Sequence, residues 1–341
     1  MSSFPRVPRR AAALLTAAAF LTLGTVASTA ADPGASIVSR TPGTGRSVEL
    51  TVYSPSMQRD IALQVLRPAD TETPAPTLYL LNGAGGGEDA ASWSAQTDLA
   101  GFFADKHVNV VVPLEGAFSY YTDWQRPDPG LAENLGNNGR NMWATFLTEE
   151  LPPVIDTAFG TTGANAIAGI SMAATSVLDL TIRAPELYRA AAAYSGCAMT
   201  SDPLGRAFVT LVVSLGGGDS ENMWGPVDGP GWREHDPYLH ADRLPDIPMY
   251  ISSGTGLPGR YDTATDPRLR GDQKMLWNQL LVGGGIEAAA DYCTRALQRR
   301  TQELGRTDIV FDLRPAGTHS WGYWEDDLHR SWPLLAAALG V

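Results

Sequence analysis

The sequence contains few cysteines and few basic residues, and each shortage excludes a class of protein. Two cysteines occur among 341 residues, with no C-x-x-C pair and no Cys/His cluster, so neither a zinc site nor any other metal or cofactor is expected. The 25 Lys and Arg residues are outnumbered by 37 Asp and Glu residues, and the formal net charge is −12. This negative charge argues against binding to nucleic acid or to an anionic membrane surface, and we attribute it to solubility.

Long apolar runs are absent after the first 31 residues. Before that point, three arginines precede the run AAALLTAAAFLTLGTV, and small residues follow it. This order predicts a secretory signal peptide over residues 1–31, cleaved after Ala30 or Ala31, with a retained membrane anchor as the alternative. Its removal leaves a net charge of about −15 and one expected domain over residues 32–341. We therefore expect a secreted or cell-wall-associated protein, exported by either the Sec or the twin-arginine route.

The predicted export signal bears on the oxidation state of the two cysteines, Cys197 and Cys293. An exported chain folds in an oxidising compartment, where paired cysteines are commonly bonded. We therefore expect a disulfide between Cys197 and Cys293, with two buried thiols as the alternative.

Strand-like and helix-like segments alternate along the chain, without an internal repeat or a long linker. Short apolar and β-branched runs predict strands over 59–68, 76–83, 109–116, 164–171, 190–196, 210–217, 248–254 and 308–317. Apolar residues at helical spacing predict helices over 141–160, 172–184, 286–305 and 326–340. This alternation predicts an α/β fold with a mostly parallel sheet covered by helices on both faces. Catalytic groups in such sheets lie beyond the C-terminal ends of the strands.

The segment Gly169-Ile170-Ser171-Met172-Ala173 lies at the junction of a predicted strand and a predicted helix. It has the G-x-S-x-A form of a nucleophile elbow, in which a strained turn holds a serine hydroxyl within reach of a base. Small residues two positions before and after the serine let strand and helix approach closely. The helix N-terminus also offers the Met172 N–H to an oxyanion. We therefore predict that Ser171 is a nucleophile; the alternative is a small residue at a tight turn.

A second oxyanion donor is expected from a loop after an earlier strand. Residues 82–87, with the sequence NGAGGG, lie at the end of the predicted strand 76–83. Glycines let a backbone turn its N–H groups toward a ligand. The alternatives are a flexible surface loop and a phosphate cradle, and the cradle is disfavoured because no G-K-[ST] sequence follows.

His319 is the best-placed base among the five histidines. Hydrolases with this elbow have the chain order Ser, Asp or Glu, His, and His319 directly follows the last predicted strand. The acid is less well determined. Asp262 and Asp266 follow the next-to-last strand, whereas Glu287 lies in the first turn of a predicted helix, where an acidic residue also complements the helix dipole. Position and chemistry alone do not separate Asp262 from Glu287.

Seven stretches of the sequence match one known family, in the same order along nearly the whole mature chain. The stretches are YSPSMQRDIALQVLRPA, LYLLNGAGG, VVVPLEGAFSYYTDW, AGISMAATSVLDL, NMWGPVDGPGWREHDP, LLVGGGIEAAADYCT and GTHSWGYW. The most specific are SPSM near the start, GISMAA at the elbow and THSWxYW at the histidine. The sequence therefore resembles the secreted mycolyltransferases of the antigen 85 type, and more closely their corynomycolyltransferase relatives.

The resemblance implies an α/β-hydrolase fold without a large lid. It also implies a triad of Ser171, Glu287 and His319, with Glu287 at the place of the family's glutamate, and backbone oxyanion donors at Ala84 and Met172. The implied reaction passes a mycolyl group from trehalose monomycolate, through an acyl-enzyme on Ser171, to a second trehalose monomycolate or to arabinogalactan. The implied partners are trehalose mycolates and cell-wall glycan or glycolipid acceptors, with peripheral contact to the outer lipid layer.

The chain departs from the family in a loop that helps to hold trehalose. Where the family often has Asp and, three residues later, Arg, this sequence has Asn82 and Gly85. Asn82 can still hydrogen-bond a sugar hydroxyl, whereas Gly85 offers no side chain. Trp321 and Trp324 match the family and are expected to form an apolar wall or a sugar platform, or else part of the core. The altered loop keeps a secreted carboxylesterase as an alternative function, and a non-enzymatic wall-binding or adhesin protein is a third.

Overall fold

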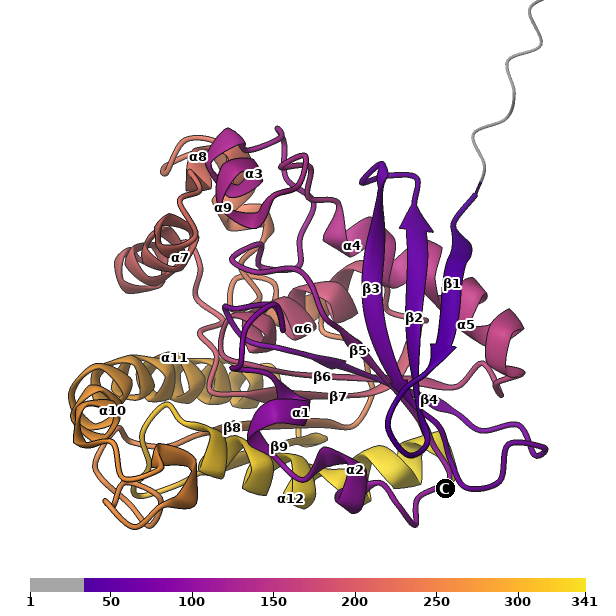
Figure 1. Ribbon diagram of the computed structural model, residues 1–341. Helices are drawn as coiled ribbons and strands as arrows, with labels where there is room; N and C mark the ends of the chain where they lie inside the picture. Colours follow the sequence, from indigo (N-terminus) through magenta and orange to yellow (C-terminus); the bar gives the residue numbers. More distant parts are fainter. Residues whose placement is uncertain (1–33) are drawn as a thin grey trace, which may run out of the picture. The chain divides into compact units, whose positions relative to one another are not determined.

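A nine-stranded sheet runs through the part of the chain that the computed structural model describes, residues 34–341 (Figure 1). The strands are β1 (Ser36–Pro42), β2 (Ser47–Ser54), β3 (Arg59–Leu66), β4 (Thr77–Leu81), β5 (Asn109–Pro113), β6 (Asn165–Ile170), β7 (Tyr188–Tyr194), β8 (Met249–Ser253) and β9 (Ile309–Leu313). The predicted signal peptide over residues 1–31 lies outside the described residues.

Helices connect these strands. The α-helices are α1 (Trp93–Gln96), α2 (Leu99–Phe102), α3 (Pro129–Leu135), α4 (Trp143–Thr145), α5 (Leu151–Phe159), α6 (Met172–Arg183), α7 (Pro203–Leu215), α8 (Ser220–Trp224), α9 (Pro230–Glu234), α10 (Gln273–Asn278), α11 (Gly284–Glu303) and α12 (Trp321–Leu339). Short π- and 3₁₀-helical turns are η1 (Phe146–Glu150), η2 (Ala241–Arg243), η3 (Pro267–Leu269) and η4 (Gln279–Gly283). None of the helices in this described part is both long and apolar enough to cross a membrane.

The strand order across the sheet is β1-β2-β3-β5-β4-β6-β7-β8-β9. β1, β2, β3 and β5 pair antiparallel, and the strands from β5 to β9 run parallel. The prediction of a mostly parallel α/β sheet is confirmed, with an antiparallel edge that the sequence did not indicate. All seven residues of β1 are exposed, so no apolar pattern marks that strand.

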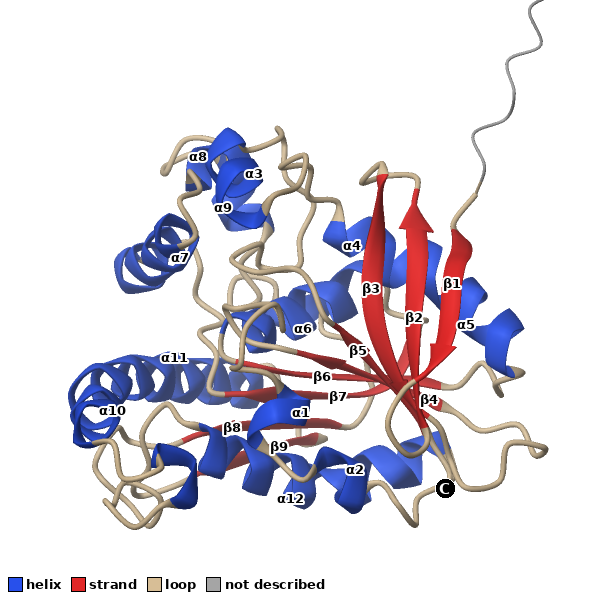
Figure 2. Ribbon diagram, in the orientation of Figure 1, coloured by secondary structure: helices blue, strands red, loops and turns tan. Residues whose placement is uncertain are grey.

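Alternate residues of the central strands face two separate cores. On β4, Tyr79 and Leu81 pack toward α5 and α6, whereas Leu78 and Leu80 pack toward α1, α2 and α12. Successive side chains of a strand point to opposite faces, so both faces of this strand need a cover. Figure 2 shows helices on both sides of the parallel strands. The C-terminal ends of the strands therefore remain as the open edge on which a site can form.

Residues 210–217, predicted to be a strand, lie mostly within helix α7 and its end. Asp202 caps this helix and Pro203 occupies its first turn. Val209 and Val213, four residues apart, are buried on one side of the helix. The prediction was wrong because the run TLVVS has strand propensity by itself, while the helix start signals lie before it. The other predicted strands and helices are present, with ends that differ by a few residues.

Cys197 and Cys293 are joined by a disulfide between the segment after β7 and helix α11. The two cysteines are 96 residues apart in sequence. Cys293 is almost completely buried and packs with Met199 and Ala296. The bond fastens α11 beside the sheet.

Replacing both cysteines by serine should lower the free energy of unfolding by about 2–4 kcal/mol, because the unfolded chain loses a cross-link that closes a long loop. Urea unfolding followed by tryptophan fluorescence measures the change, with the wild-type protein in a reducing agent as a second form of the same test. On reduction, the intact mass of the wild-type protein should rise by two hydrogen atoms. An unchanged urea midpoint in the double variant would contradict the prediction.

Candidate active site

Ser171 stands at the turn between β6 and α6 on a strained backbone. Its φ of 56° and ψ of −122° lie in a region that residues other than glycine rarely adopt. The Ser171 N–H donates to the carbonyl oxygen of Tyr194 at 2.8 Å, which fixes the turn. A Cβ at Gly169 would lie 2.9 Å from the Cβ of Ala173, so only glycine allows strand and helix to meet this closely. This is the geometry of a nucleophile elbow.

His319 and Glu287 form a hydrogen-bonded line with this serine. His319 Nε2 lies 2.7 Å from Ser171 Oγ, and His319 Nδ1 lies 2.8 Å from Glu287 Oε2. A carboxylate on Nδ1 favours the tautomer whose Nε2 can accept a proton from the serine hydroxyl. The three side chains come from the β6–α6 turn, from α11 and from the segment after β9. They therefore have the geometry of a nucleophile, a base and an orienting acid.

Asp262 and Asp266, the other two candidates for the acid, do not contact His319. Asp262 accepts the Tyr323 hydroxyl at 2.7 Å and so fastens the segment after β8 to α12. Burial, and then this bond to Asp262, raise the pKa of Tyr323 above its usual range. Asp266 caps the first turn of η3. The structure thus brings Glu287, and neither aspartate, to the histidine.

Glu287 is completely buried, and both of its carboxylate oxygens have partners. Oε2 faces His319, while Oε1 accepts the Gly254 N–H at 2.6 Å and the Ser195 hydroxyl at 2.8 Å. Such bonds offset the cost of burying a carboxylate. Ser195 in turn accepts the indole N–H of Trp324 at 3.1 Å, and the Trp324 ring packs edge-on against His319 with centroids 4.8 Å apart. Trp324 therefore supports both the histidine and the acid.

Ser195 and Gly254 are contributors that sequence analysis did not single out. Ser195 follows β7 and Gly254 follows β8, at the same edge of the sheet as Ser171. Ser195 also has a positive φ of 58°. Their position directly after two parallel strands could have identified them from the sequence, because functional groups in such sheets lie at the C-terminal ends of the strands.

The N–H groups of Ala84 and Met172 are the expected oxyanion donors. Neither N–H donates to an acceptor within the described part of the chain. Met172 begins α6, so the helix dipole adds a partial positive charge there. The Ala84 carbonyl accepts the Phe118 N–H at 2.7 Å, and a Cβ at Gly86 would lie 2.2 Å from a backbone nitrogen. This loop is therefore closely packed rather than a loose surface loop.

The expected sugar contact of Asn82 is wrong. Its side chain is completely buried: Nδ2 donates to the Pro113 carbonyl at 3.0 Å, and Oδ1 accepts the Trp93 N–H at 3.0 Å. The amide ties the loop after β4 to β5 and α1, so it has no polar group to offer a ligand. At Gly85, a Cβ would lie 2.7 Å from the Asp89 carboxylate, so an acidic rather than a basic side chain lies here.

Two pockets meet at His319. The first is an apolar slot that leads from Ser171 between α7 and α11, where Phe208, Val212 and Ala289 line it. Its volume is about 50 Å³. The slot is therefore narrow between α7 and α11.

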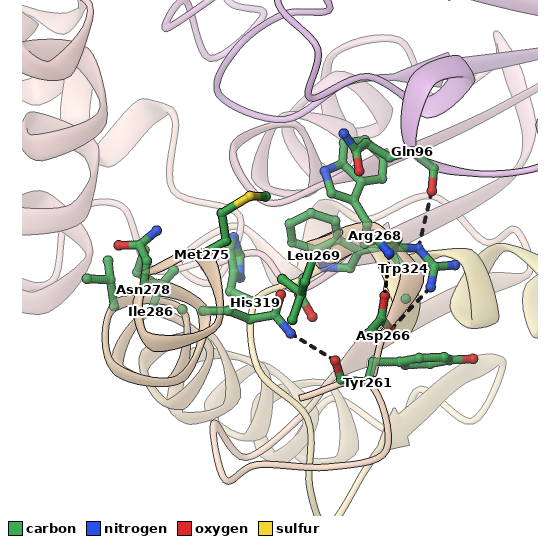
Figure 3. Close-up of a pocket in the computed structure, with 16 residues that line it drawn as sticks. Gln96, Tyr261, Asp266, Arg268, Leu269, Met275, Asn278, Ile286, His319 and Trp324 are labelled. Carbon is green, nitrogen blue, oxygen red and sulfur yellow. Dashed lines mark hydrogen bonds and ion pairs between the residues drawn. The ribbon is translucent and has the colours of Figure 1, made fainter. Parts of the chain in front are cut away.

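The second pocket is larger, about 260 Å³, and is lined by a mixture of polar, aromatic and aliphatic side chains (Figure 3). Gln96, Arg268 and Asn278 provide hydrogen-bonding groups, and Trp321 forms part of the wall. The Arg268 side chain donates to the Gln96 carbonyl at 3.2 Å and pairs with Asp266, which fixes its position. Trp324 is 6% exposed and belongs to the core, as the alternative expected, although it also lines the pocket. Trp321 lines the pocket and also packs on Trp93 and Trp324, so its role as a wall or platform stays a prediction.

The remaining histidines do not contact this catalytic line. His235 is bonded to Asp179, and His329 stacks on Phe102. Within residues 34–341, no group of three or more His, Cys, Asp or Glu side chains could hold a metal ion.

The parallel strands, the serine elbow after β6 and the histidine after β9 define the α/β-hydrolase fold class. Comparison with known families gives the particular group: the chain belongs to the family described as "Putative esterase", whose sequence model matches residues 54–335. Together with the relatives below, this membership makes the protein an enzyme of the acyltransferase or esterase kind.

Three known proteins illustrate the similarity. The diacylglycerol acyltransferase/mycolyltransferase Ag85A of Mycobacterium tuberculosis (strain ATCC 25618 / H37Rv) is 32% identical over 297 residues, which are 86% of this chain and 81% of the relative. The crystal structure of Mycobacterium tuberculosis MPT51 has a TM-score of 0.67 at 25% identity, covering 84% of this chain and 96% of that one. Staphylococcus aureus FphF, a fluorophosphonate-binding serine hydrolase, shares the fold, with a TM-score of 0.58 at 18% identity and coverage of 87% and 99%. The resemblance to antigen 85 proteins is confirmed, whereas the closer likeness to corynomycolyltransferases stays a prediction.

The variants Gly169→Ala and Gly285→Ala test the close packing of the elbow, because they add the same methyl group in two different surroundings. At Gly169 the methyl meets Ala173, and we expect the free energy of unfolding to fall by about 1–3 kcal/mol, with slower ester hydrolysis as Ser171 shifts. At Gly285, on α11, nothing lies within 4 Å, and we expect stability to rise by up to about 1 kcal/mol. The urea midpoint measures the stability of each variant, and the rate of p-nitrophenyl ester hydrolysis measures its activity. Equal effects at the two positions would argue against the packed elbow.

Proposed function

We propose that the protein is a serine acyltransferase that moves a mycolyl, or other long-chain acyl, group from trehalose monomycolate to trehalose monomycolate or arabinogalactan. The observation that carries this proposal is the continuous hydrogen-bonded line of Ser171, His319 and Glu287, with distances of 2.7 and 2.8 Å. We also propose that residues 1–31 are a signal peptide, and that the domain over 32–341 acts outside the cell or at its wall.

Acylation begins when Ser171 Oγ attacks the ester carbonyl of the donor. His319 Nε2 takes the serine proton, and Glu287 holds the imidazole and stabilises the imidazolium. The carbonyl oxygen becomes an oxyanion that the N–H groups of Ala84 and Met172 bind; loss of one such donor costs about 100- to 1000-fold in rate. When the carbon–oxygen bond to the sugar breaks, His319 returns the proton to the leaving sugar oxygen.

Deacylation repeats these steps with a second sugar. A hydroxyl of the acceptor loses its proton to His319 Nε2 and attacks the acyl-enzyme carbonyl, which releases Ser171. The kinetics should therefore be ping-pong. Transfer exceeds hydrolysis when the acceptor hydroxyl is positioned and water is excluded from the acyl-enzyme.

The two pockets suit the two halves of such a donor. The slot between α7 and α11 is apolar and begins at Ser171, which suits the start of an acyl chain. The pocket on the other side of His319 is lined by Gln96, Arg268, Asn278 and Trp321, which suits sugar hydroxyls and a sugar face. We assign the polar recognition to this pocket, because Asn82 is buried and engaged elsewhere.

An exposed apolar rim beside the second pocket fits a lipid substrate. Met275 and Trp277 of α10 and Leu281 and Val282 of η4 are all exposed, and Trp277 and Leu281 are 60% and 70% exposed. Met275 and Val282 also line the pocket. Contiguous exposed apolar residues mark surfaces that contact lipids, proteins or ligands. We propose that this rim makes peripheral contact with the outer lipid layer.

A secreted carboxylesterase on the same fold is the second candidate. The observation that favours it is the loop after β4, where Gly85 has no side chain and Asn82 is buried and engaged, so neither residue offers a side-chain group to an acceptor sugar. Such an enzyme would form the same acyl-enzyme but release it mainly to water. The ratio of transfer to hydrolysis with a sugar acceptor present separates the two.

Intact-protein mass spectrometry after exposure to trehalose monomycolate, or to a short-chain ester, tests the proposal. We expect an acyl adduct on the wild-type protein and none on Ser171→Ala, because no other serine is activated by His319. Ser39→Ala, at an exposed serine of β1, is the matched control and should keep the adduct. Release of the adduct faster by trehalose than by water would support the transferase.

The other outcomes are equally informative. Release by water at the same rate with or without sugar would favour the carboxylesterase. No adduct with any ester would contradict both enzymes and favour the non-enzymatic wall-binding alternative.

Ala289→Phe tests the assignment of the slot to the acyl chain. A phenyl ring at this position fills the space between α7 and α11, so kcat/KM for long-chain esters should fall about 10-fold or more relative to acetyl esters. Leu215→Phe, at an exposed position of α7, is the control for an added aromatic ring. If the ratio of long-chain to acetyl activity does not change in Ala289→Phe, the acyl chain takes another path.

A further inference from the structure

A buried arginine lies beside the acid of this site. Arg314, which follows β9, is 7% exposed, and its Nη2 lies 3.7 Å from Glu287 Oε1. Its Nη1 forms an ion pair with Asp327 of α12, which is also completely buried. One positive charge is therefore shared by two buried carboxylates. Neither Arg314 nor Asp327 lines the slot or the second pocket, so neither has a direct role in the acyl-transfer steps.

The cluster of Glu287, Asp327 and Arg314 holds two carboxylates and one guanidinium, so it lacks one positive charge for neutrality when both carboxylates are ionised. Burial raises the pKa of Asp327 to about 7; Arg314 opposes this shift, and the charge of Glu287 adds to it. Burial also works against the charge of Arg314, yet the charges of Asp327 and Glu287 raise its pKa, so it stays protonated. Two ionised carboxylates facing one guanidinium carry a net charge of −1, whereas protonation of Asp327 makes the cluster neutral. The charge beside the catalytic acid thus depends on Asp327.

The other titratable groups packed around Asp327 do not supply the missing charge. Tyr194 of β7 and Tyr250 of β8 face it, and burial raises the pKa of both phenols, so they stay neutral. Asp312 of β9 accepts the Tyr250 hydroxyl at 2.6 Å and pairs with Arg330 at 3.0 Å. Arg314 is therefore the cation that Asp327 and Glu287 share.

The groups around His319 are likewise neutral or paired. Ser171 and Trp324, which contact the imidazole, carry no charge. In the neighbouring pocket, Arg268 pairs with Asp266 and with Glu325 of α12. Asp262, earlier in that segment, accepts hydrogen bonds from four hydroxyl or amide groups. Glu287 is the carboxylate in direct contact with the imidazole.

We propose that Arg314 is a positioning residue for Glu287, and that the ionisation of Asp327 determines how far the positive charge of Arg314 offsets the negative charge of Glu287. With Asp327 protonated, Arg314 offsets the charge of Glu287, and the imidazolium that forms on His319 is stabilised less. With Asp327 ionised, the two carboxylates share Arg314, and Glu287 stabilises the imidazolium more strongly. The inference rests on the proposed function, because it assigns a role to residues behind the proposed acid.

Charge substitutions give this proposal a distinctive signature. The ionised wild-type cluster and the double variant Arg314→Met/Asp327→Asn both carry a net charge of −1, whereas Asp327→Asn alone is neutral. Because Asp327 is only partly ionised near pH 7, the wild-type cluster lies between these two charges. We therefore expect the midpoint of the kcat/KM–pH profile on a short-chain ester to be lowest in Asp327→Asn, intermediate in the wild type and highest in the double variant, with about 0.5–1 pH unit between the two variants.

Two further variants separate charge from shape. Arg314→Met leaves Glu287 and Asp327 buried without a counter-charge, so activity should fall about 10-fold or more. Arg314→Lys keeps the charge and should recover most of that loss. Thermal unfolding of every variant identifies any that is not folded, and the near-isosteric Asp327→Asn together with the double variant keeps the test valid if Arg314→Met is not.

A second readout needs no turnover. The imidazole ¹³C resonance of His319, assigned by its loss in His319→Gln, reports the titration of this side chain directly. It should show the same order: Asp327→Asn lowest, the wild type intermediate and the double variant highest. If no acyl-enzyme forms, the proposed function fails while this titration still tests the charge sharing. If an acyl-enzyme forms but wild type and Asp327→Asn titrate together by both methods, the charge sharing is overturned and the function stands.

Discussion

The buried carboxylate of Glu287 is the interaction on which the geometry of the site depends. It comes from α11, and it accepts hydrogen bonds from the segments that follow β7, β8 and β9, through Ser195, Gly254 and His319. A buried carboxylate that loses a partner is costly, so each of these segments is held by the same requirement. The position of the imidazole, and so its distance to Ser171, follows from how this one charge is satisfied.

His319 also divides the site into two chemically different halves. On one side the apolar slot between α7 and α11 starts at the serine, and on the other lies the pocket of mixed polar, aromatic and aliphatic lining, formed largely by the segment after β8. An imidazole between two such halves can serve a substrate whose ester joins an apolar chain to a polar group. The pockets differ in character because different connections build them: the slot uses the α7 insertion, whereas the pocket uses α10, η4 and the start of α12.

The sequence predicted the parts of this site that depend on local structure. The elbow around Ser171 could be identified because a strand, a turn and a helix leave their pattern within a few residues, and His319 could be identified from its place after the last strand. The residues alone did not decide which carboxylate orients His319, because an acidic residue such as Glu287 in a first helical turn also has an ordinary electrostatic explanation. Asn82 was misassigned because the burial of its side chain results from packing against β5 and α1, which no local pattern shows.

The residues that support Glu287 could not be predicted from the sequence either, because their contacts also depend on long-range packing. Ser195, Arg314 and Asp327 come together around Glu287 only when the sheet edge, α11 and α12 are packed, and Ser195 lies far along the chain from the other two. The α7 helix was misread because a β-branched run has the same composition in a strand as in a helix that buries one side. Long-range packing, rather than residue type, decides these cases.

The disulfide has a consequence for the hydrogen bond between Ser195 and Glu287. Cys197 lies two residues after Ser195, and Cys293 lies six residues, less than two helical turns, after Glu287. The hydroxyl and the carboxylate are thus joined by a short covalent path through the disulfide, and their hydrogen bond closes that path into a small ring. In the language of linked binding sites, the disulfide gives each group a high effective concentration for the other.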